Sequence, residues 1–114
     1  MAISGVGVDI IDIARFKKFR KNKQHPFIKK VFTTREIKHC FSYHDPAPHL
    51  AGTFVAKESA SKALGATETF FLTLEIRRDK QGAPEVWEKN KKIKSMLISI
   101  THTNNTALAI AIKK

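Results

Sequence analysis

The chain contains a central helical pattern, Leu50-Ala51-Gly52-Thr53-Phe54-Val55-Ala56-Lys57-Glu58-Ser59-Ala60-Ser61-Lys62-Ala63-Leu64-Gly65. Its apolar residues recur at helical spacing, it is rich in alanine, and Gly65 stands where a helix C-terminus favours glycine. On the 3.6-residue period Glu58, Ser61, Lys62 and Gly65 lie along one stripe. A carboxylate, a hydroxyl and an ammonium beside an approachable backbone suit a metal and a phosphate.

The alternative is an ordinary amphipathic helix with a solvated face. On such a helix Glu58 and Lys62 form an i,i+4 pair worth about 0.2–0.5 kcal/mol. Spacing alone favours this alternative, because such pairs are common on helices. The choice therefore depends on features elsewhere in the chain.

Length and composition limit the class of protein. The 114 residues are expected to form one domain, 1–114, which is too small to enclose a deep cavity, so that a substrate cleft is expected to need a second subunit. No apolar run approaches the ~18 residues of a membrane span, and the first residues lack the pattern of a signal peptide. We therefore expect a soluble, cytoplasmic protein with no membrane partner. The single cysteine, Cys40, is expected to be a small buried hydrophobe.

The charge is strongly positive. The net charge is +11, from 21 Lys and Arg against 10 Asp and Glu. Between Arg15 and Lys38 lie ten basic residues and one acid, Glu36. This concentration favours an anionic partner, which on charge alone is a nucleic acid, an acidic protein or a polyphosphate cofactor. Solvated surface lysines are the plain alternative.

Residues 3–11 alternate as in a strand. One face carries Val6, Val8 and Ile10, and the other carries Gly5, Gly7 and Asp9. Two glycines weaken a strand unless something must approach it closely, and here a carboxylate stands in line with them. Asp9 is therefore a second candidate site residue, with a surface Asp at a strand end as the alternative.

The other elements follow from pattern and capping. Asp12 is expected to cap a helix that buries Ile13, Phe16 and Phe19. Pro26 is expected to begin a further helical turn. The segment Thr33-Thr34-Arg35-Glu36 is expected to form a capping box. Strands are predicted at residues 69–78, 84–87, 96–102 and 106–112, the last covered on both sides, and one or two helical turns at 88–95. The predicted class is α+β, an antiparallel sheet with a long central helix and shorter helices.

Three segments together resemble a known family: Gly5-Val6-Gly7-Val8-Asp9-Ile10, the run from Phe54 to Gly65, and Ile98-Ser99-Ile100-Thr101-His102-Thr103. Their order and spacing resemble the bacterial holo-(acyl-carrier-protein) synthases, the small trimeric 4′-phosphopantetheinyl transferases. The resemblance covers essentially the whole chain. It implies the 4′-phosphopantetheinyl transferase fold and, in fatty acid biosynthesis, transfer of the phosphopantetheine arm of coenzyme A to a serine of apo acyl carrier protein. It also implies the release of adenosine 3′,5′-bisphosphate and a requirement for magnesium.

The resemblance also implies roles for single residues. Asp9 and Glu58 match the magnesium ligands, in agreement with the preference of Mg²⁺ for carboxylate oxygens and retained waters. Lys62 matches a lysine near the pyrophosphate of coenzyme A, and with Glu58 it forms the expected catalytic pair. Gly65 would let that phosphate approach the helix end. Three candidates remain for the base that removes the serine proton: Glu58, a metal-bound water and a carboxylate of the carrier protein.

The remaining matches concern binding. His102 and Thr103 resemble the adenosine-phosphate side of the site, and Arg15 matches an arginine that meets the acidic carrier protein. Sites between the chains of a homotrimer would supply the cleft that one small domain lacks. Four histidines match no motif and are interpreted as surface residues: His25, His39, His44 and His49.

One departure from the family pattern bears on cofactor binding. Thr53 stands where many members carry an arginine thought to hold a coenzyme A phosphate, and Lys57 could compensate only if it reached the cleft. A relative that binds coenzyme A without efficient transfer is therefore one alternative. A nucleic-acid-binding module is another, but the basic helices have few interleaved aromatics and this role leaves Asp9, Glu58 and Lys62 without a purpose. We expect no nucleic-acid partner.

Overall fold

The computed structural model describes residues 2–69 and 71–114, and the predicted α+β class with antiparallel sheets and a long helix is confirmed. The elements in chain order are β1 (Gly5–Asp12), the 3-10 helix η1 (Ile13–Phe19), α1 (Pro26–Val31), α2 (Thr34–Cys40), α3 (Ala47–Ala63), β2 (Leu74–Arg78), β3 (Pro84–Glu88), β4 (Lys91–Lys92), β5 (Met96–His102) and β6 (Thr106–Lys113).

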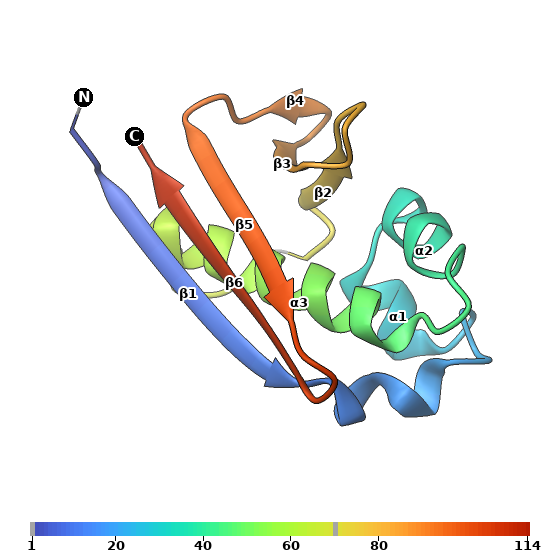
Figure 1. The fold of residues 1–114 in the computed structure, drawn as a ribbon. Helices are drawn as coiled ribbons and strands as arrows, with labels where there is room; N and C mark the ends of the chain where they lie inside the picture. The colour runs from blue at the N-terminus through green and yellow to red at the C-terminus, as the bar shows by residue number, and fades with distance from the viewer. Residues whose placement is uncertain (1, 70) are drawn as a thin grey trace.

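The strands form two antiparallel sheets. The larger has the order β1-β6-β5 and the smaller the order β2-β3-β4. Helix α3 crosses one face of the larger sheet, while α1 and α2 lie near the beginning of α3 (Figure 1). The smaller sheet lies at the other end of β5 from His102 (Figure 1). Within the described ranges, no helix has the length and apolar character needed to cross a bilayer.

Very small residues let α3 approach the larger sheet. A Cβ atom added to Gly5 would lie 2.0 Å from the carbonyl oxygen of Ala63, and one added to Gly7 would lie 1.9 Å from that of Ser59. The central strand β6 presents three fully buried alanines to the same helix: Ala107, Ala109 and Ala111. The glycines of the N-terminal strand therefore serve a close helix-strand contact.

Substitution of Gly7 by alanine is expected to destabilise the fold by about 1–3 kcal/mol, the usual cost of overpacking. The clash is with backbone of α3, so that strand and helix must separate. Urea unfolding measures the loss. The matched control is Gly52→Ala, whose Cβ would lie 3.1 Å from a side-chain methyl of Ile100, which can shift. Since alanine also favours the helix by about 0.5–1 kcal/mol, the control is expected to be near neutral; equal losses for both variants would contradict the contact.

The opposite face of the larger sheet is apolar and uncovered. Val6, Val8 and Ile10 are 62%, 53% and 62% exposed, and Ile110 of β6 is 38% exposed. The prediction that both sides of the last strand are covered is therefore wrong for the chain by itself. Helix α3 covers the alanine side, and nothing in the described part of this chain covers the other.

The short helices match their predicted patterns. Ile13, Phe16 and Phe19 are buried on η1, although Asp12 makes no capping hydrogen bond. The capping box of α2 is confirmed: Thr33 Oγ1 accepts from the backbone of Glu36, whose carboxylate accepts from the backbone of Thr33.

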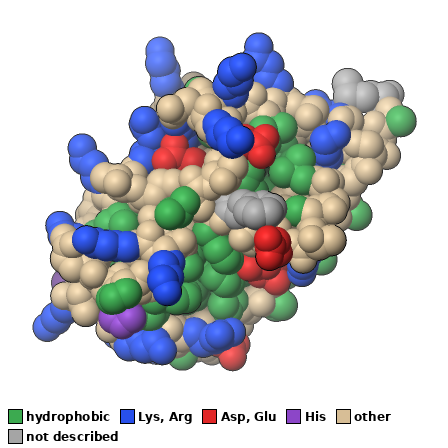
Figure 2. Space-filling view, turned by 180° about the vertical axis from the view of Figure 1, so that it is seen from behind, with side chains coloured by type: hydrophobic (Ala, Val, Ile, Leu, Met, Phe, Trp, Pro, Cys, Tyr) green, Lys and Arg blue, Asp and Glu red, His purple; other side chains and the backbone are tan. Residues whose placement is uncertain are grey.

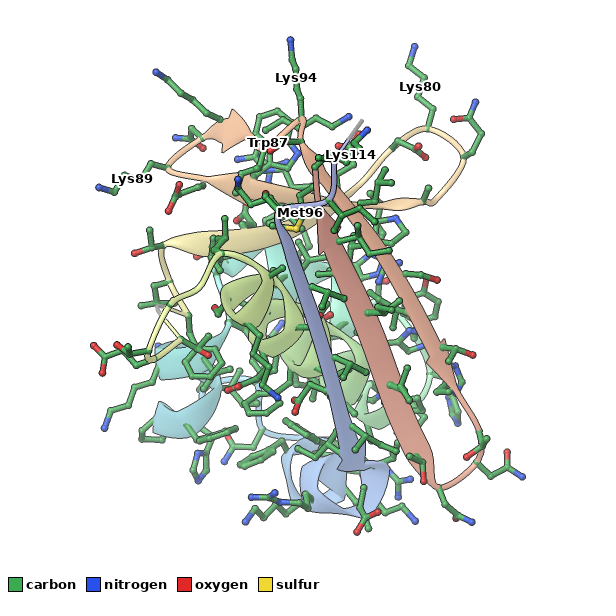
Figure 3. All side chains as sticks on the ribbon, turned by 90° about the vertical axis from the view of Figure 1, so that its left-hand side faces the viewer. Lys80, Trp87, Lys89, Lys94, Met96 and Lys114 are labelled. Carbon is green, nitrogen blue, oxygen red and sulfur yellow. The ribbon has the colours of Figure 1, made fainter. Side chains whose placement is uncertain are left out.

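Two differences from the sequence prediction lie near the smaller sheet. The strand expected at 69–78 begins only at Leu74, and Leu72 is 57% exposed; Phe70 lies outside the described residues. The expected helical turns at 88–95 are replaced by strand β4, which follows a turn with positive φ at Lys89 and Asn90. Side chains of Lys80, Lys89 and Lys94 project outward at this end of the molecule (Figure 3).

Candidate active site

Helix α3 is central and not amphipathic, since twelve of its seventeen residues are buried. The alternative of a helix with a solvated face is therefore wrong. The stripe predicted from helical period is also divided: Ser61 is buried and its hydroxyl has no hydrogen-bond partner among the described residues, whereas Lys62 is exposed.

The end of α3 and strand β1 bring a carboxylate and an ammonium together. The Nζ atom of Lys62 lies 3.4 Å from Oδ1 of Asp9 and donates to the carbonyl oxygen of Val8 at 3.0 Å. Lys62 thus pairs with Asp9 across the strand-helix contact. The amphipathic-helix alternative predicted an ion pair between Lys62 and Glu58, but no such pair is found in the described part of the chain.

Register places Glu58 beside this pair. Gly5 meets Ala63 and Gly7 meets Ser59, so each step of two residues along β1 corresponds to about one turn back along α3. Asp9 is the next residue on that face and lies at the turn that carries Glu58. Glu58 is half-buried, and its carboxylate makes no hydrogen bond or ion pair within the described residues. A carboxylate without a protein partner remains open to a cation.

Two carboxylates fit Mg²⁺ better than a metal that needs a full protein cage. The described residues contain no group of three or more His, Cys, Asp or Glu side chains placed to hold a metal ion. Mg²⁺ is usually bound through one or two carboxylates, with waters and substrate phosphates as its other ligands. The pair Asp9 and Glu58 matches that donor set.

Gly65 ends α3 as its position in the sequence predicted. Its φ is +76°, and the amides of Gly65 and Ala66 donate to the carbonyls of Lys62 and Ser61 at 3.0 Å each. These two bonds form a Schellman motif, which needs the left-handed conformation that glycine adopts without strain. Among the described residues, no atom beyond those of Gly65 and its chain neighbours lies within 4 Å of the position of a Cβ on Gly65. The backbone there is open to approach.

His102 and Thr103 lie at the other end of α3. The ring of His102 is 6.4 Å from that of His49, in the first turns of the helix. From His49 to Lys62 the helix rises about 20 Å, at ~1.5 Å per residue. Within one chain, the structure therefore brings together Asp9, Lys62 and the turn of Glu58, but not His102. The hydroxyl of Thr103 accepts from the amides of Asn105 and Thr106 and shapes the turn between β5 and β6.

The other histidines were interpreted as surface residues without a role, and three of them are partly buried and make contacts within the fold. His39 and His49 are half-buried and line one pocket with His102. His25 caps α1, since its Nδ1 accepts from the amide of Phe27 at 3.0 Å. The fourth, His44, is exposed. The gathering of His39 and His49 had no sequence signal, because their elements meet only in the tertiary fold.

Lys57 does not reach the candidate site. It is fully buried, and its Nζ donates to the Glu36 carboxylate at 2.6 Å and to the carbonyl of Val31 at 2.9 Å. Burial lowers the pKa of Lys57 and raises that of Glu36. Thr53 is buried as well, 3.5 Å from the sulfur of Cys40. Neither residue supplies the phosphate contact that the family arginine was expected to make.

Cys40 is fully buried, as predicted. Burial raises the pKa of its thiol to about 12, so the thiol is protonated at neutral pH. Cys40 is therefore a packing residue.

Arg15 is exposed on η1 and lines a pocket of about 300 Å³. Lys18 and the aromatic residues Phe16, Phe19, Phe27 and Phe54 line the same pocket. An apolar floor with cations at its rim suits a protein segment that carries both acidic and apolar side chains.

Comparisons with known proteins identify the family. The family described as the 4'-phosphopantetheinyl transferase superfamily matches residues 5–112. A holo-[acyl-carrier-protein] synthase of Thermodesulfovibrio yellowstonii is 42% identical over 113 residues, covering 96% of this chain and 97% of the relative. One from Chlamydia trachomatis serovar L2 is 38% identical over 115 residues, covering 95% of this chain and 97% of the relative.

Solved structures give the same result for the fold. A holo-(acyl-carrier-protein) synthase from Bacillus anthracis, in complex with CoA (3',5'-ADP), has a TM-score of 0.80 at 30% identity and covers 97% of this chain and 96% of its own. The Helicobacter pylori enzyme in complex with coenzyme A has a TM-score of 0.80 at 30% identity, covering 96% of this chain and 99% of its own. The chain belongs to the 4'-phosphopantetheinyl transferase superfamily.

Proposed function

We propose that the chain transfers the 4′-phosphopantetheine arm of coenzyme A to a serine of apo acyl carrier protein, as a cytoplasmic enzyme of fatty acid biosynthesis. The observation that carries the proposal is the meeting of Asp9, Lys62 and the turn of Glu58 where β1 crosses α3. Support comes from near full-length relatives that are holo-[acyl-carrier-protein] synthases and from solved relatives in complex with coenzyme A.

Phosphopantetheine transfer requires the protein to stabilise negative charge on the phosphate groups. The serine oxygen attacks the phosphorus next to the pantetheine arm, and the bond from that phosphorus to the bridging pyrophosphate oxygen breaks, which releases adenosine 3′,5′-bisphosphate. Asp9 and Glu58 would hold Mg²⁺, which neutralises charge on the pyrophosphate when bound. Lys62 is 52% exposed and can turn its ammonium from Asp9 to a phosphate oxygen. The base that takes the serine proton remains one of the three named above.

The carrier protein is expected to dock at η1. Arg15 and Lys18 rim the apolar pocket there, and the basic segment between residues 15 and 38 has its one acid, Glu36, buried. Lys and Arg side chains lie at many places on one face of the molecule, with hydrophobic patches and some Asp and Glu side chains between them (Figure 2). An acidic carrier protein would be steered to such a surface, which raises the rate of encounter more than the affinity.

A homotrimer with sites between its chains fits two observations. The outer face of the larger sheet exposes a row of apolar side chains, Val6, Val8, Ile10 and Ile110. Such a patch on a sheet marks an interaction surface. The separation of about 20 Å between His102 and Lys62 along α3 also suits a site in which neighbouring chains contribute opposite ends.

Val8→Lys is expected to convert the trimer into a folded monomer, because it places a charge at the centre of the apolar face. Light scattering during size-exclusion chromatography measures the mass. Leu72→Lys is the control, since Leu72 is equally exposed but lies outside the larger sheet. A trimer that survives Val8→Lys would exclude this face as the interface.

The function itself is tested by intact mass. Apo acyl carrier protein is incubated with the chain, coenzyme A and Mg²⁺, and a gain of one phosphopantetheine arm is expected. No gain with several carrier proteins, for a chain shown to be folded, would refute the proposed transfer. Omission of Mg²⁺ tests the metal requirement separately.

A further inference from the structure

A pocket of about 270 Å³ gathers cationic and ionisable side chains at the beginning of α3. Its walls come from four elements and a loop: His39 of α2, Tyr43 after α2, His49 of α3, Arg78 of β2 and His102 of β5. None of the described residues that line it is acidic. Of these residues only His102 was expected to bind the co-substrate.

The three imidazoles are close neighbours. The ring of His49 lies 6.4 Å from that of His39 and 6.4 Å from that of His102. It also stacks on the ring of Tyr43, with 3.5 Å between centroids and 12° between planes. The Tyr43 ring therefore fixes the orientation of His49, and its electron-rich face favours the protonated imidazole.

The surroundings of His39 and His49 favour the neutral form of both rings. Burial lowers the pKa of His39, and the charge of Arg78 lowers it further. Burial likewise lowers the pKa of His49, followed by the charges of His39, His102 and Arg78. The charge of Asp45 opposes this effect on His49 and is the smallest of the contributions; its carboxylate accepts two hydrogen bonds from Arg20, at 2.9 and 2.8 Å.

The tautomer of His102 decides how its ring meets a phosphate oxygen. Its Nδ1 lies 3.1 Å from the carbonyl oxygen of Thr103, and a carbonyl oxygen only accepts. Nδ1 therefore carries the hydrogen, and in the neutral ring Nε2 presents a lone pair. A phosphate oxygen would be repelled by that lone pair, but it would accept a hydrogen bond from the protonated ring.

We propose that His39, His49 and Arg78 form, together with His102, a phosphomonoester subsite that takes up protons when it binds and therefore binds more tightly as the pH falls. The inference rests on the proposed function, in which the ligand is the 3′-phosphate of coenzyme A. The Arg78 guanidinium supplies the charge that is present at every pH. The histidines supply the charge that depends on pH, in a chain where Thr53 and Lys57 are buried and supply none.

Comparison of two ligands isolates the 3′-phosphate. Coenzyme A and dephospho-coenzyme A share the pyrophosphate, the adenine and the pantetheine arm, so the ratio of their dissociation constants reports this group alone. A phosphomonoester loses its second proton near pH ~6, so the ligand itself has no more charge at pH 6.5 than at pH 8.5. Tighter binding at the lower pH must then come from the protein.

The experiment is titration calorimetry of the full chain in phosphate-free buffer with both ligands, at pH 6.5 and pH 8.5. The preference for coenzyme A is expected to be about two- to fivefold higher at pH 6.5, because a pKa shift of one unit in one histidine contributes at most tenfold and that limit is reached only well below pH 6.5. His49→Gln is expected to remove most of this rise. His44→Gln is the matched control and should behave as the wild type, because His44 is exposed and does not line the pocket.

The outcomes separate this inference from the proposed function. Binding of both ligands with equal affinity at both pH values would overturn the subsite and leave coenzyme A binding intact. A preference for coenzyme A that does not change with pH, or that His49→Gln and His44→Gln alter equally, would overturn the role of the histidines. No binding of either ligand would refute the proposed function and this inference with it.

Discussion

Glu58→Gln is expected to slow phosphopantetheine transfer by about a hundred- to a thousandfold, the usual effect of removing one preorganised electrostatic group from a transition state. The amide keeps the size of the side chain but loses the charge that would hold Mg²⁺. The free energy of unfolding is expected to change by less than about 0.5 kcal/mol, because the Glu58 carboxylate makes no hydrogen bond or ion pair in the described part of the chain. The rate is measured as the growth of holo carrier protein by intact mass.

The control for Glu58→Gln is Glu68→Gln, in the exposed loop after α3, which is expected to keep the wild-type rate. Asp9→Asn should resemble Glu58→Gln and in addition free Lys62 from its partner. A Glu58→Gln variant with near wild-type rate at every Mg²⁺ concentration would remove Glu58 from the site. Loss of rate with a matching loss of stability would instead make Glu58 a structural residue.

Local chemistry explains which elements were predictable. The capping box at Thr33 and the glycine at residue 65 are decided by hydrogen bonds to the nearest turn, so the sequence predicts them without the rest of the fold. Alternation likewise predicts β5 and β6, whose bounds agree with the expected strands to within a residue. Each of these features is determined by residues that are close to one another in the sequence.

Elements whose partners are distant in sequence were less predictable. Alternation in β1 identified its two faces but not that the glycine face is buried, since this depends on how closely α3 approaches. The apolar face of the same strand is left exposed, which period-2 patterning alone does not reveal. Alternation likewise extended the expected strand to 69–78, whereas β2 and its pairing with β3 begin at Leu74.

In the candidate site, too, features set by sequence neighbours were predicted and contacts between distant residues were not. Helical period placed Glu58 and Lys62 on one stripe, but the partner of Lys62 is Asp9, 53 residues away in sequence. The histidine pocket depends on contacts among α2, α3, β2 and β5 and has no local signature. The family motif predicted a binding role for His102, whereas His39 and His49 belong to no motif.

The buried pair of Lys57 and Glu36 carries the other large expected effect. Lys57→Met leaves the Glu36 carboxylate buried without its counter-charge, which is expected to destabilise the fold by about 3–5 kcal/mol near neutral pH. Glu36 also accepts the backbone amides of Thr33 and Ile76, at 2.9 and 2.7 Å, so it cannot turn to solvent without breaking both bonds. Urea unfolding measures the loss, and Lys38→Met, at an exposed lysine of α2, is the control.

The loss in Lys57→Met should depend on pH in a defined direction. Burial already raises the pKa of Glu36 in the folded chain, while Lys57 lowers it, so removal of Lys57 raises it further. A carboxyl group with a raised pKa in the folded state contributes stability that is lost as the pH rises through that pKa. The variant is therefore expected to be less destabilised at pH 5 than at pH 8. Adding Glu36→Gln should recover part of the loss at pH 8, because the amide is neutral and its single oxygen still accepts one of the two backbone amides. Equal losses at both pH values, with no recovery in the double variant, would show that Lys57 contributes by packing and not by charge.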